Sequence, residues 1–492
     1  MSEKKIIEER SLQLNRRAFL GKTALGIGGI GLASLLGTPY FNTTKNGVIT
    51  SATPNAGVKG SLGGLHHPAK IKRVIYLFQS GGPSQLELFD YKPMLNKRRG
   101  EDLPESIRNG QRLTGMTSGQ DKFPLVGSQF NFKQYGNNPA WISDLLPYTA
   151  KVADDICVIN SMYTEAINHD PAVTFFQTGS QQPGRPSIGS WLSYGLGSEN
   201  DNLPAFTVLL SRGTGRPNGQ PLYTRLWGNG FLHSLHQGVQ FRAAKDPVLY
   251  LNDPDGMNKA TKRNMLDHLA ALNDAGYEDY GDPEIKSRIA QYEMAFQMQS
   301  SVPELMDLSQ EPAHVMDLYG CKPGDGSFAA NCLLARRLAE RGVRFIQLYH
   351  KDWDHHGGVK NGIELKASEI DRACMALITD LKQRGMLEET LIVWAGEFSR
   401  TPMSQGGSGR DHHNKAMSVW LAGAGIKGGM VYGASDDLGY AAVENITTVH
   451  DLHATMLHQF GISHDAFSFK FQGLDAKLTG VEGAKVIKQI IA

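Results

Sequence analysis

The sequence of 492 residues is poor in cysteine and has no excess of charge of either sign. Its formal net charge of +1 gives no global field that would recruit nucleic acid or an anionic membrane, so neither partner is expected. The four cysteines lie in apolar or helical contexts without C-x-x-C spacing, and we expect buried free thiols, with one disulfide as the alternative. They are Cys157, Cys321, Cys332 and Cys374.

The N-terminal apolar run is too short to cross a membrane. It extends from Ala24 to Leu36, about thirteen residues, whereas a helix must span a hydrocarbon core of roughly 30 Å. The preceding segment N-R-R-A-F-L-G-K resembles the twin-arginine export motif, so residues 1–40 are predicted to be an export signal. Cleavage is expected between Gly37 and Gly60, which leaves no stable membrane span; an ordinary buried helix after a basic one is the alternative. The export route, which carries folded and often metal-loaded proteins, predicts a periplasmic or extracellular location.

The remaining chain alternates between short apolar runs and longer amphipathic segments. Residues 41–68 are rich in Gly, Thr, Asn and Ser and predict a linker, followed by a domain over 69–492. The expected strands are 72–78, 154–160, 203–210, 343–349, 391–395 and 416–421, and the expected helices are 171–177, 327–340, 365–384 and 450–460. This alternation indicates βαβ units, hence an α/β fold with a central, mostly parallel sheet. Residues near 211–320 are irregular and are predicted to be an insertion that caps the sheet.

Metal-binding residue types follow two of these strands. Asp354 and His356 come after 343–349 and are two residues apart, so in an extended segment both side chains point to one side. Glu397 follows 391–395, and a Gly-rich loop then brings Asp411, His412 and His413. Ligands of parallel sheets bind outside the carboxyl ends of the strands, so we expect these residues to meet there. Carboxylates and imidazoles together suit zinc, manganese or iron better than calcium; solvated polar turns are the alternative.

Four further side chains are candidates for catalysis. Ser84 follows the glycines after the first strand and is either a nucleophile or, preferably, the cap in a capping box with Glu87. His169 precedes a helix and is either a metal ligand or an acid/base, with Arg185 as an anion clamp; a helix cap and a surface arginine are the alternative. Arg400, three residues after Glu397, either binds a substrate oxyanion or pairs with Glu397.

Several motifs in fixed order carry a family resemblance. These are G-G-P-S-Q-L-E-L-F-D-Y-K-P, D-W-D-H-H-G, G-E-F-S-R-T-P, G-R-D-H-H and H-D-L-H-A-T-M-L-H-Q-F-G-I. Over residues 68–480 the chain resembles domain-of-unknown-function family 1501, which is similar to the alkaline phosphatase and sulfatase superfamily. The resemblance implies a three-layer sandwich around a mostly parallel sheet, a metal site at its carboxyl edge, and hydrolysis of phosphate or sulfate esters. It also keeps calcium among the candidate metals.

The chain departs from that superfamily in three motifs, one of which is the metal-ligand pattern: D-x-x-x-H and D-H are replaced by Asp354-x-His356 and Glu397. The metal-binding aspartate that ends the first strand is replaced by Gln79-Ser80-Gly81, and the C-x-P-x-R nucleophile motif is replaced by His169-Asp170-Pro171-Ala172-Val173. The sequence therefore predicts an exported, metal-dependent hydrolase of a sulfate or phosphate ester, with a carbohydrate ester as one candidate, but not the standard sulfatase mechanism. The alternatives are a non-catalytic protein that binds a glycan or a partner at the cell surface, and metal-assisted hydrolysis of another ester or a peptide.

Overall fold

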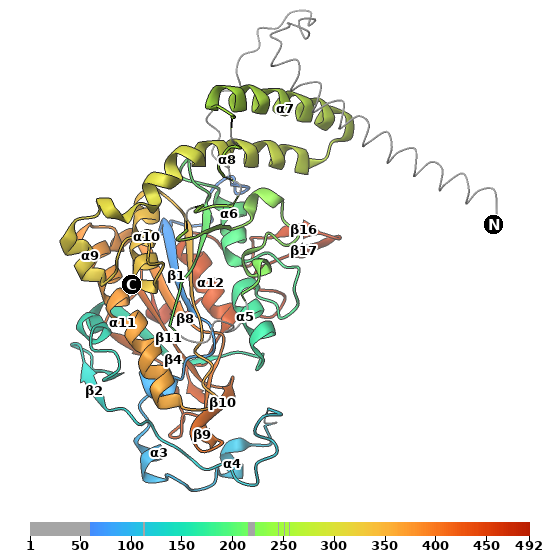
Figure 1. Ribbon diagram of the computed structural model, residues 1–492. Helices are drawn as coiled ribbons and strands as arrows, with labels where there is room; N and C mark the ends of the chain where they lie inside the picture. Colours follow the sequence, from blue (N-terminus) through green and yellow to red (C-terminus); the bar gives the residue numbers. More distant parts are fainter. Residues whose placement is uncertain (1–59, 112–113, 215–221, 245, 250, 255) are drawn as a thin grey trace, which may run out of the picture. The chain divides into compact units, whose positions relative to one another are not determined.

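A nine-stranded sheet forms the centre of the computed structural model (Figure 1), which describes residues 60–111, 114–214, 222–244, 246–249, 251–254 and 256–492. The strands follow the order β12-β4-β11-β8-β1-β7-β5-β6, and β15 also pairs with β4. Their bounds are β1 Arg73–Gln79, β4 Ile156–Tyr163, β5 Phe206–Leu210, β6 Val239–Phe241, β7 Phe345–His350, β8 Thr390–Ala395, β11 Met417–Gly423, β12 Met430–Tyr432 and β15 Thr447–Thr448. Only the two pairings of β11 are antiparallel in this sheet, so the predicted mostly parallel sheet is confirmed.

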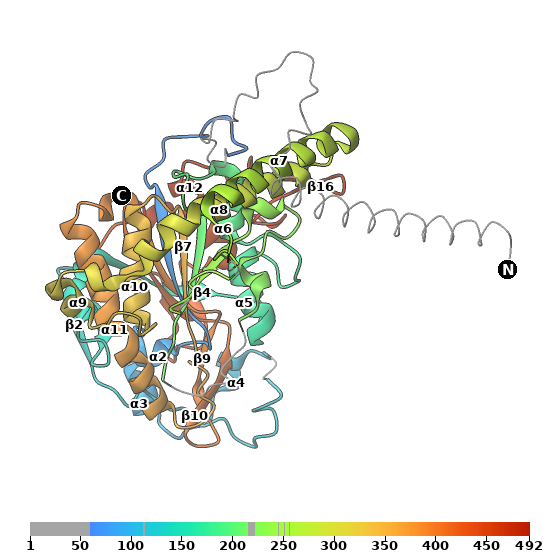
Figure 2. The same cartoon turned by 45° about the horizontal axis from the view of Figure 1, so that its top comes forward.

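Helices cover both faces of the sheet, because side chains alternate along each buried strand. In β1, Val74, Tyr76 and Phe78 belong to one apolar cluster, whereas Ile75 and Leu77 belong to the other. The first cluster includes α5 (His169–Thr178), α6 (Ile188–Leu196) and α12 (Val449–Gln459). The second includes α9 (Ala313–Tyr319), α10 (Phe328–Glu340) and α11 (Val359–Gln383). Figures 1 and 2 show these two sets on opposite sides, which confirms the α/β architecture of three layers.

Shorter elements surround this core. Three short helices follow β1: α2 (Gln85–Leu88), α3 (Pro93–Lys97) and α4 (Glu105–Arg108). The two-stranded pairs are β2 (Phe132–Tyr135) with β3 (Ala140–Ser143), β9 (Ser399–Gln405) with β10 (Gly409–His413), β13 (Ala434–Ser435) with β14 (Ala442–Glu444), and β16 (Phe469–Phe471) with β17 (Leu474–Ala476). The expectation of a Gly-rich loop before His412 was wrong: the glycines form the turn of the β9–β10 hairpin, and His412 lies on its second strand.

Residues 252–293 form a compact unit of their own. It contains α7 (Lys259–Tyr280) and the first part of α8 (Pro283–Met306), joined by an ion pair from Arg263 to Glu293. The predicted export signal and most of the predicted linker lie outside the described residues. Within the described ranges, no helix is both long and apolar enough to cross a membrane. All four cysteines are buried and free, as expected.

His453 gives the folded protein a dependence on pH. This residue of α12 is fully buried, its Nε2 lies 2.9 Å from the Phe176 carbonyl oxygen, and burial lowers its pKa to about 3. An unfolded histidine titrates near about 6.5, so protonation favours the unfolded chain. The contribution of neutral His453 to the free energy of unfolding is therefore fully present above about pH 6.5 and is lost as the pH falls towards about 3.

We expect His453→Gln, which keeps an N–H donor without titrating, to flatten the fall in the free energy of unfolding between pH 6.5 and pH 4. Chemical denaturation of both proteins across this range measures the difference in slope. His314→Gln, at an exposed histidine, is the matched control and should keep the wild-type slope. Equal slopes for His453→Gln and the wild type would contradict a buried neutral histidine.

Candidate metal centre

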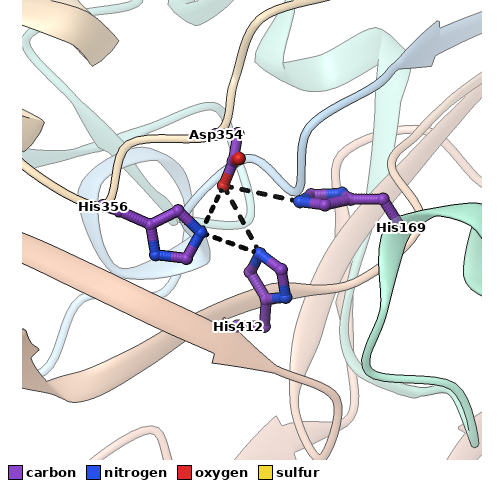
Figure 3. Close-up of side chains that lie close together, drawn as sticks. All are labelled: His169, Asp354, His356 and His412. Atoms are coloured by element: carbon purple, nitrogen blue, oxygen red, sulfur yellow. Dashed lines mark hydrogen bonds and ion pairs between the residues drawn. The ribbon is translucent and has the colours of Figure 1, made fainter. Parts of the chain in front are cut away.

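Four side chains from three segments converge at the carboxyl edge of the sheet. Asp354 and His356 lie in the loop after β7, His412 lies on β10, and His169 is the first residue of α5, which follows β4. One possible ligand atom from each of the four lies within 4.8 Å of those from the others. Figure 3 shows the three imidazole rings around the carboxylate. The structure thus brings together three of the residues expected as ligands and His169, which was expected as either a ligand or an acid/base.

The Asp354 Oδ1 atom is the common point of the cluster. It lies 2.8 Å from His356 Nε2 and 3.4 Å from the Nε2 atoms of His412 and His169. His356 Nε2 and His412 Nε2 are 3.0 Å apart. Ligand atoms around a tetrahedral zinc ion are separated by about 3.4 Å, so these spacings match a single cation.

The Nδ1 atom of each of the three imidazole rings makes a hydrogen bond to a group outside the cluster. The Nδ1 atoms of His169, His356 and His412 lie 2.6 Å from Glu397 Oε1, 2.6 Å from Gln405 Oε1 and 2.9 Å from the Ile167 carbonyl oxygen, respectively. Since these partners are acceptors, each Nδ1 carries the proton and each Nε2 presents a lone pair to the cluster. Three lone pairs and a carboxylate repel one another unless a cation lies between them. Metal-binding histidines are typically oriented by such acceptors.

Burial and charge favour a cation at this position. Burial alone would raise the Asp354 pKa, but its close contacts with the three histidines and the charge of Arg400 hold it well below its usual range. Burial lowers the pKa of His412 to about 4. Burial also acts to lower the His169 pKa, yet the neighbouring carboxylates of Asp354 and Glu397 outweigh this and raise it. The two carboxylates beside His169 thus favour positive charge there, whether a proton or a metal ion supplies it.

Arg400 holds the cluster in place instead of facing a substrate. Its guanidinium is buried and donates from Nη2 to Asp354 Oδ1 at 2.8 Å, from Nε to the Gly82 carbonyl at 2.8 Å, and to the Gly81 carbonyl. The expected pair with Glu397 is replaced by this pair with Asp354. With its donors turned to the protein, Arg400 is not placed as an oxyanion clamp.

Gly81 lets the loops that carry the cluster approach each other. Its φ is +119°, and a Cβ there would lie 2.5 Å from the backbone nitrogen of Trp353 and 2.7 Å from that of Asp354. Its own N–H donates to Glu397 Oε1 at 2.8 Å. Glycine is therefore required for both the conformation and the space, and the Gly-Gly turn after β1 serves the Asp354 loop.

Glu397 lies behind His169. Its carboxylate is fully buried, with Oε1 accepting from the Gly81 N–H and from His169, while Oε2 has no hydrogen-bond partner. The cluster of four ligand atoms does not include it. The geometry gives Glu397 the role of orienting His169 and increasing the basicity of its Nε2 atom.

Two other expected ligands point elsewhere. Asp411 Oδ2 accepts a 2.6 Å hydrogen bond from the Thr117 hydroxyl and another from the Thr114 hydroxyl. His413 donates from Nε2 to the Tyr440 carbonyl, and burial lowers its pKa to about 4. These residues flank His412 but fix neighbouring segments in place.

The two remaining catalytic candidates are also separate from the cluster. The Ser84 hydroxyl donates to Glu87, whose other oxygen accepts 2.7 and 3.0 Å hydrogen bonds from Arg410. The expected capping box is therefore wrong: Ser84 makes no side-chain cap on α2, because the Glu87 carboxylate is turned to Arg410. Arg185 is exposed in the loop between α5 and α6.

The acceptors of two rings were not predicted from the sequence. Gln405 reaches His356 only because the β9–β10 hairpin places it there, and the Ile167 carbonyl is a backbone group that no sequence pattern marks. The Gly-rich segment before His412 contained the one usable signal, since a hairpin would place Gln405 opposite Gly409, which lies against the His356 backbone.

The fold and site define an α/β protein with a candidate metal centre of three histidines and one aspartate at the carboxyl edge of a mostly parallel sheet. The chain belongs to the family described as "Protein of unknown function (DUF1501)", whose model matches residues 71–491. Among curated proteins, none matches the chain by sequence.

Solved structures with a similar arrangement have low sequence identity. The sulfatase PsFucS1 from Pseudoalteromonas sp. is 11% identical, with a TM-score of 0.33 over 80% of this chain and 68% of that one. A protein in the alkaline phosphatase superfamily from Vibrio parahaemolyticus is 11% identical, with a TM-score of 0.34 over 81% of this chain and 68% of that one. The lipoteichoic acid synthase LtaP from Listeria monocytogenes is 8% identical, with a TM-score of 0.34 over 85% and 76%. At such scores, the function has to be argued from the side chains of the site.

We expect Glu397→Gln to weaken zinc binding by about 10- to 100-fold, since loss of the charge lowers the basicity of His169. Competition between the protein and a chromophoric chelator measures the dissociation constant. Glu388→Gln, at an exposed position, is the matched control and should bind zinc like the wild type. An unchanged affinity in Glu397→Gln would show that Glu397 does not act on the metal through His169.

Proposed function

We propose that this protein is an exported, metal-dependent hydrolase of an anionic ester, a sulfate or a phosphate. The observation that carries the proposal is the common orientation of His169, His356 and His412, each with Nδ1 hydrogen-bonded and Nε2 directed at Asp354 Oδ1. A polar surface turn would not fix three rings in one tautomer. The motifs that resemble family 1501, which is similar to the alkaline phosphatase and sulfatase superfamily, favour the same reaction.

The charge of the site suits an anionic substrate. Asp354 and Arg400 neutralise each other, at 2.8 Å, and Glu397 contributes one further negative charge. A divalent cation would leave the centre with a net charge of about +1. The site would then attract a sulfate or phosphate ester, whereas the chain as a whole is nearly neutral.

Solvent reaches the cluster from one side. The side chains of His169, Asp354 and His356 are 18%, 21% and 26% exposed, whereas that of His412 is 5% exposed. A substrate could therefore approach over the first three, while His412 closes the rear of the site. Because four protein ligands fill a tetrahedral shell, a water or a substrate oxygen would have to bind as a fifth ligand on this exposed side.

Water is the nucleophile that we propose. The Ser84 hydroxyl is buried and donates to Glu87, so it is not available for attack, and the sequence has no cysteine at the sulfatase nucleophile position. When bound, a divalent cation supplies positive charge that polarises an ester and acidifies water. Three imidazoles and one carboxylate suit zinc or manganese better than calcium. His169 then acts as a ligand, which leaves the role of acid/base to water.

Metal content and turnover test the proposal together. We expect about one zinc or manganese ion per chain in protein purified without chelators, and hydrolysis of 4-nitrophenyl sulfate or phosphate that chelation abolishes and the metal restores. His412→Ala should lose the metal and reduce kcat/KM by about a thousandfold or more, because it removes a ligand. His314→Ala, at an exposed histidine, should retain both metal and activity.

Two outcomes would contradict the proposal. Protein without stoichiometric metal would show that the cluster is not a metal centre. Metal-loaded protein that hydrolyses none of a panel of sulfate, phosphate and carboxylate esters would favour a binding protein at the cell surface. The unavailable Ser84 hydroxyl is the observation that keeps this second function open.

A further inference from the structure

A polar cavity adjoins the candidate metal centre. It has a volume of about 420 Å³ and is lined by Gln111, Thr114, Ile167, Asn168, Asn414 and Lys415. Three of these lining residues are close to the cluster in sequence or structure: Asn168 precedes His169, the Ile167 carbonyl accepts from His412, and Asn414 follows His412 by two residues. The cavity therefore lies beside the segments that carry His169 and His412.

Asn168 does not make the contact that its position usually provides. It occupies the N-cap of α5, where an asparagine side chain normally accepts a backbone N–H of the first turn. Here its φ and ψ are −103° and 142°, as in a normal cap, but its side chain makes no capping hydrogen bond. Its amide lines the cavity instead. The side chain thus keeps both a donor and an acceptor for a ligand.

Lys415 brings a positive charge to the same cavity. Its side chain is exposed, and in the described part of the chain its ammonium has no ion-pair or hydrogen-bond partner. No carboxylate is among the described residues that line the cavity. A negatively charged group would therefore be attracted, and a positively charged one repelled.

The outer wall of the cavity is fixed to the metal-binding strand. Thr114 and Thr117 both donate to Asp411, which directly precedes His412. On the other side of the cavity, the Gln111 amide donates to Asn414 Oδ1 at 3.4 Å, and Asn414 donates to the Glu165 carbonyl at 3.2 Å. The wall and the metal ligands are thus held by one set of hydrogen bonds, so the cavity keeps its position relative to the centre.

We propose that this cavity binds the alcohol part of the substrate and that this alcohol is polyhydroxylated and carries a second acidic group. The Asn168 amide can both donate to and accept from a ligand, which matches hydroxyl groups, and Lys415 binds the second anion. A volume of about 420 Å³ is large enough for a group of the size of a sugar ring. The inference rests on the proposed function, because the ester is placed at the metal centre.

Calorimetric titration of metal-loaded protein with inorganic sulfate, a hexose monosulfate and a hexose disulfate tests the cavity without requiring turnover. We expect the wild type to bind the disulfate tightest. Lys415→Gln should weaken binding of the disulfate by about tenfold relative to binding of the monosulfate, because the substitution removes a hydrogen bond to a charged group. Asn168→Ala should weaken binding of both hexose ligands by about threefold to tenfold relative to binding of inorganic sulfate. The matched control Lys470→Gln, at an exposed lysine of β16, should bind all three like the wild type.

The outcomes separate this inference from the proposed function. If Lys415→Gln and Asn168→Ala bind the hexose sulfates like Lys470→Gln, or if the wild type binds neither hexose sulfate, the cavity assignment is wrong, even where aryl esters are hydrolysed. If the two variants lose affinity as expected while the wild type hydrolyses no ester, the cavity assignment stands and the hydrolase proposal fails.

Discussion

Three imidazole rings turn the same nitrogen towards one carboxylate oxygen, and most of the surrounding polar structure follows from that constraint. Each ring must donate its Nδ1 proton elsewhere, so Glu397, Gln405 and the Ile167 carbonyl lie behind His169, His356 and His412. Protein hydrogen bonds alone leave the Nε2 lone pairs facing one another. A cation resolves this conflict, and only a site built for a cation would need three separate acceptors to create it.

The same constraint explains the buried charges at the sheet edge. Asp354 must stay ionised while partly buried, and Arg400 provides the compensating charge while also binding the two carbonyls of the Gly81-Gly82 turn. Breaking such a buried pair leaves an uncompensated charge, which costs several kcal/mol, roughly 3–5. Arg400 therefore joins the β1 loop to the Asp354 loop, and Gly81 provides the space between them. The arginine that looked like a substrate-binding group is part of the scaffold of the metal centre.

The sequence predicted the scaffold better than the details of the site. Buried apolar runs and helical periodicity are local properties, so the strands β1, β7 and β8 and their parallel pairing could be predicted, and with them the edge at which Asp354 and His356 lie. The role of Glu397 could not be predicted. A carboxylate that binds a metal and one that accepts a hydrogen bond from a histidine can both directly follow a strand, so the two roles have the same sequence pattern. The position of Gln405 depends on the register of the β9–β10 hairpin, which was not predicted because glycines 406, 407 and 409 indicated a loop.

The segment Asp411-His412-His413 shows why spacing alone is insufficient. Three consecutive ligand-type residues on a strand would normally alternate between its two sides, yet the pairing of β10 with β9 shifts in register between Arg410 and His412. Asp411 then turns to the Thr114 segment, His412 to the cluster and His413 to the Tyr440 carbonyl. Such an irregularity re-aims side chains beside active sites. Here one irregular strand supplies a candidate metal ligand, an acceptor for the threonines of the cavity wall and a buried neutral histidine, so a single shift of register would disrupt all three at once.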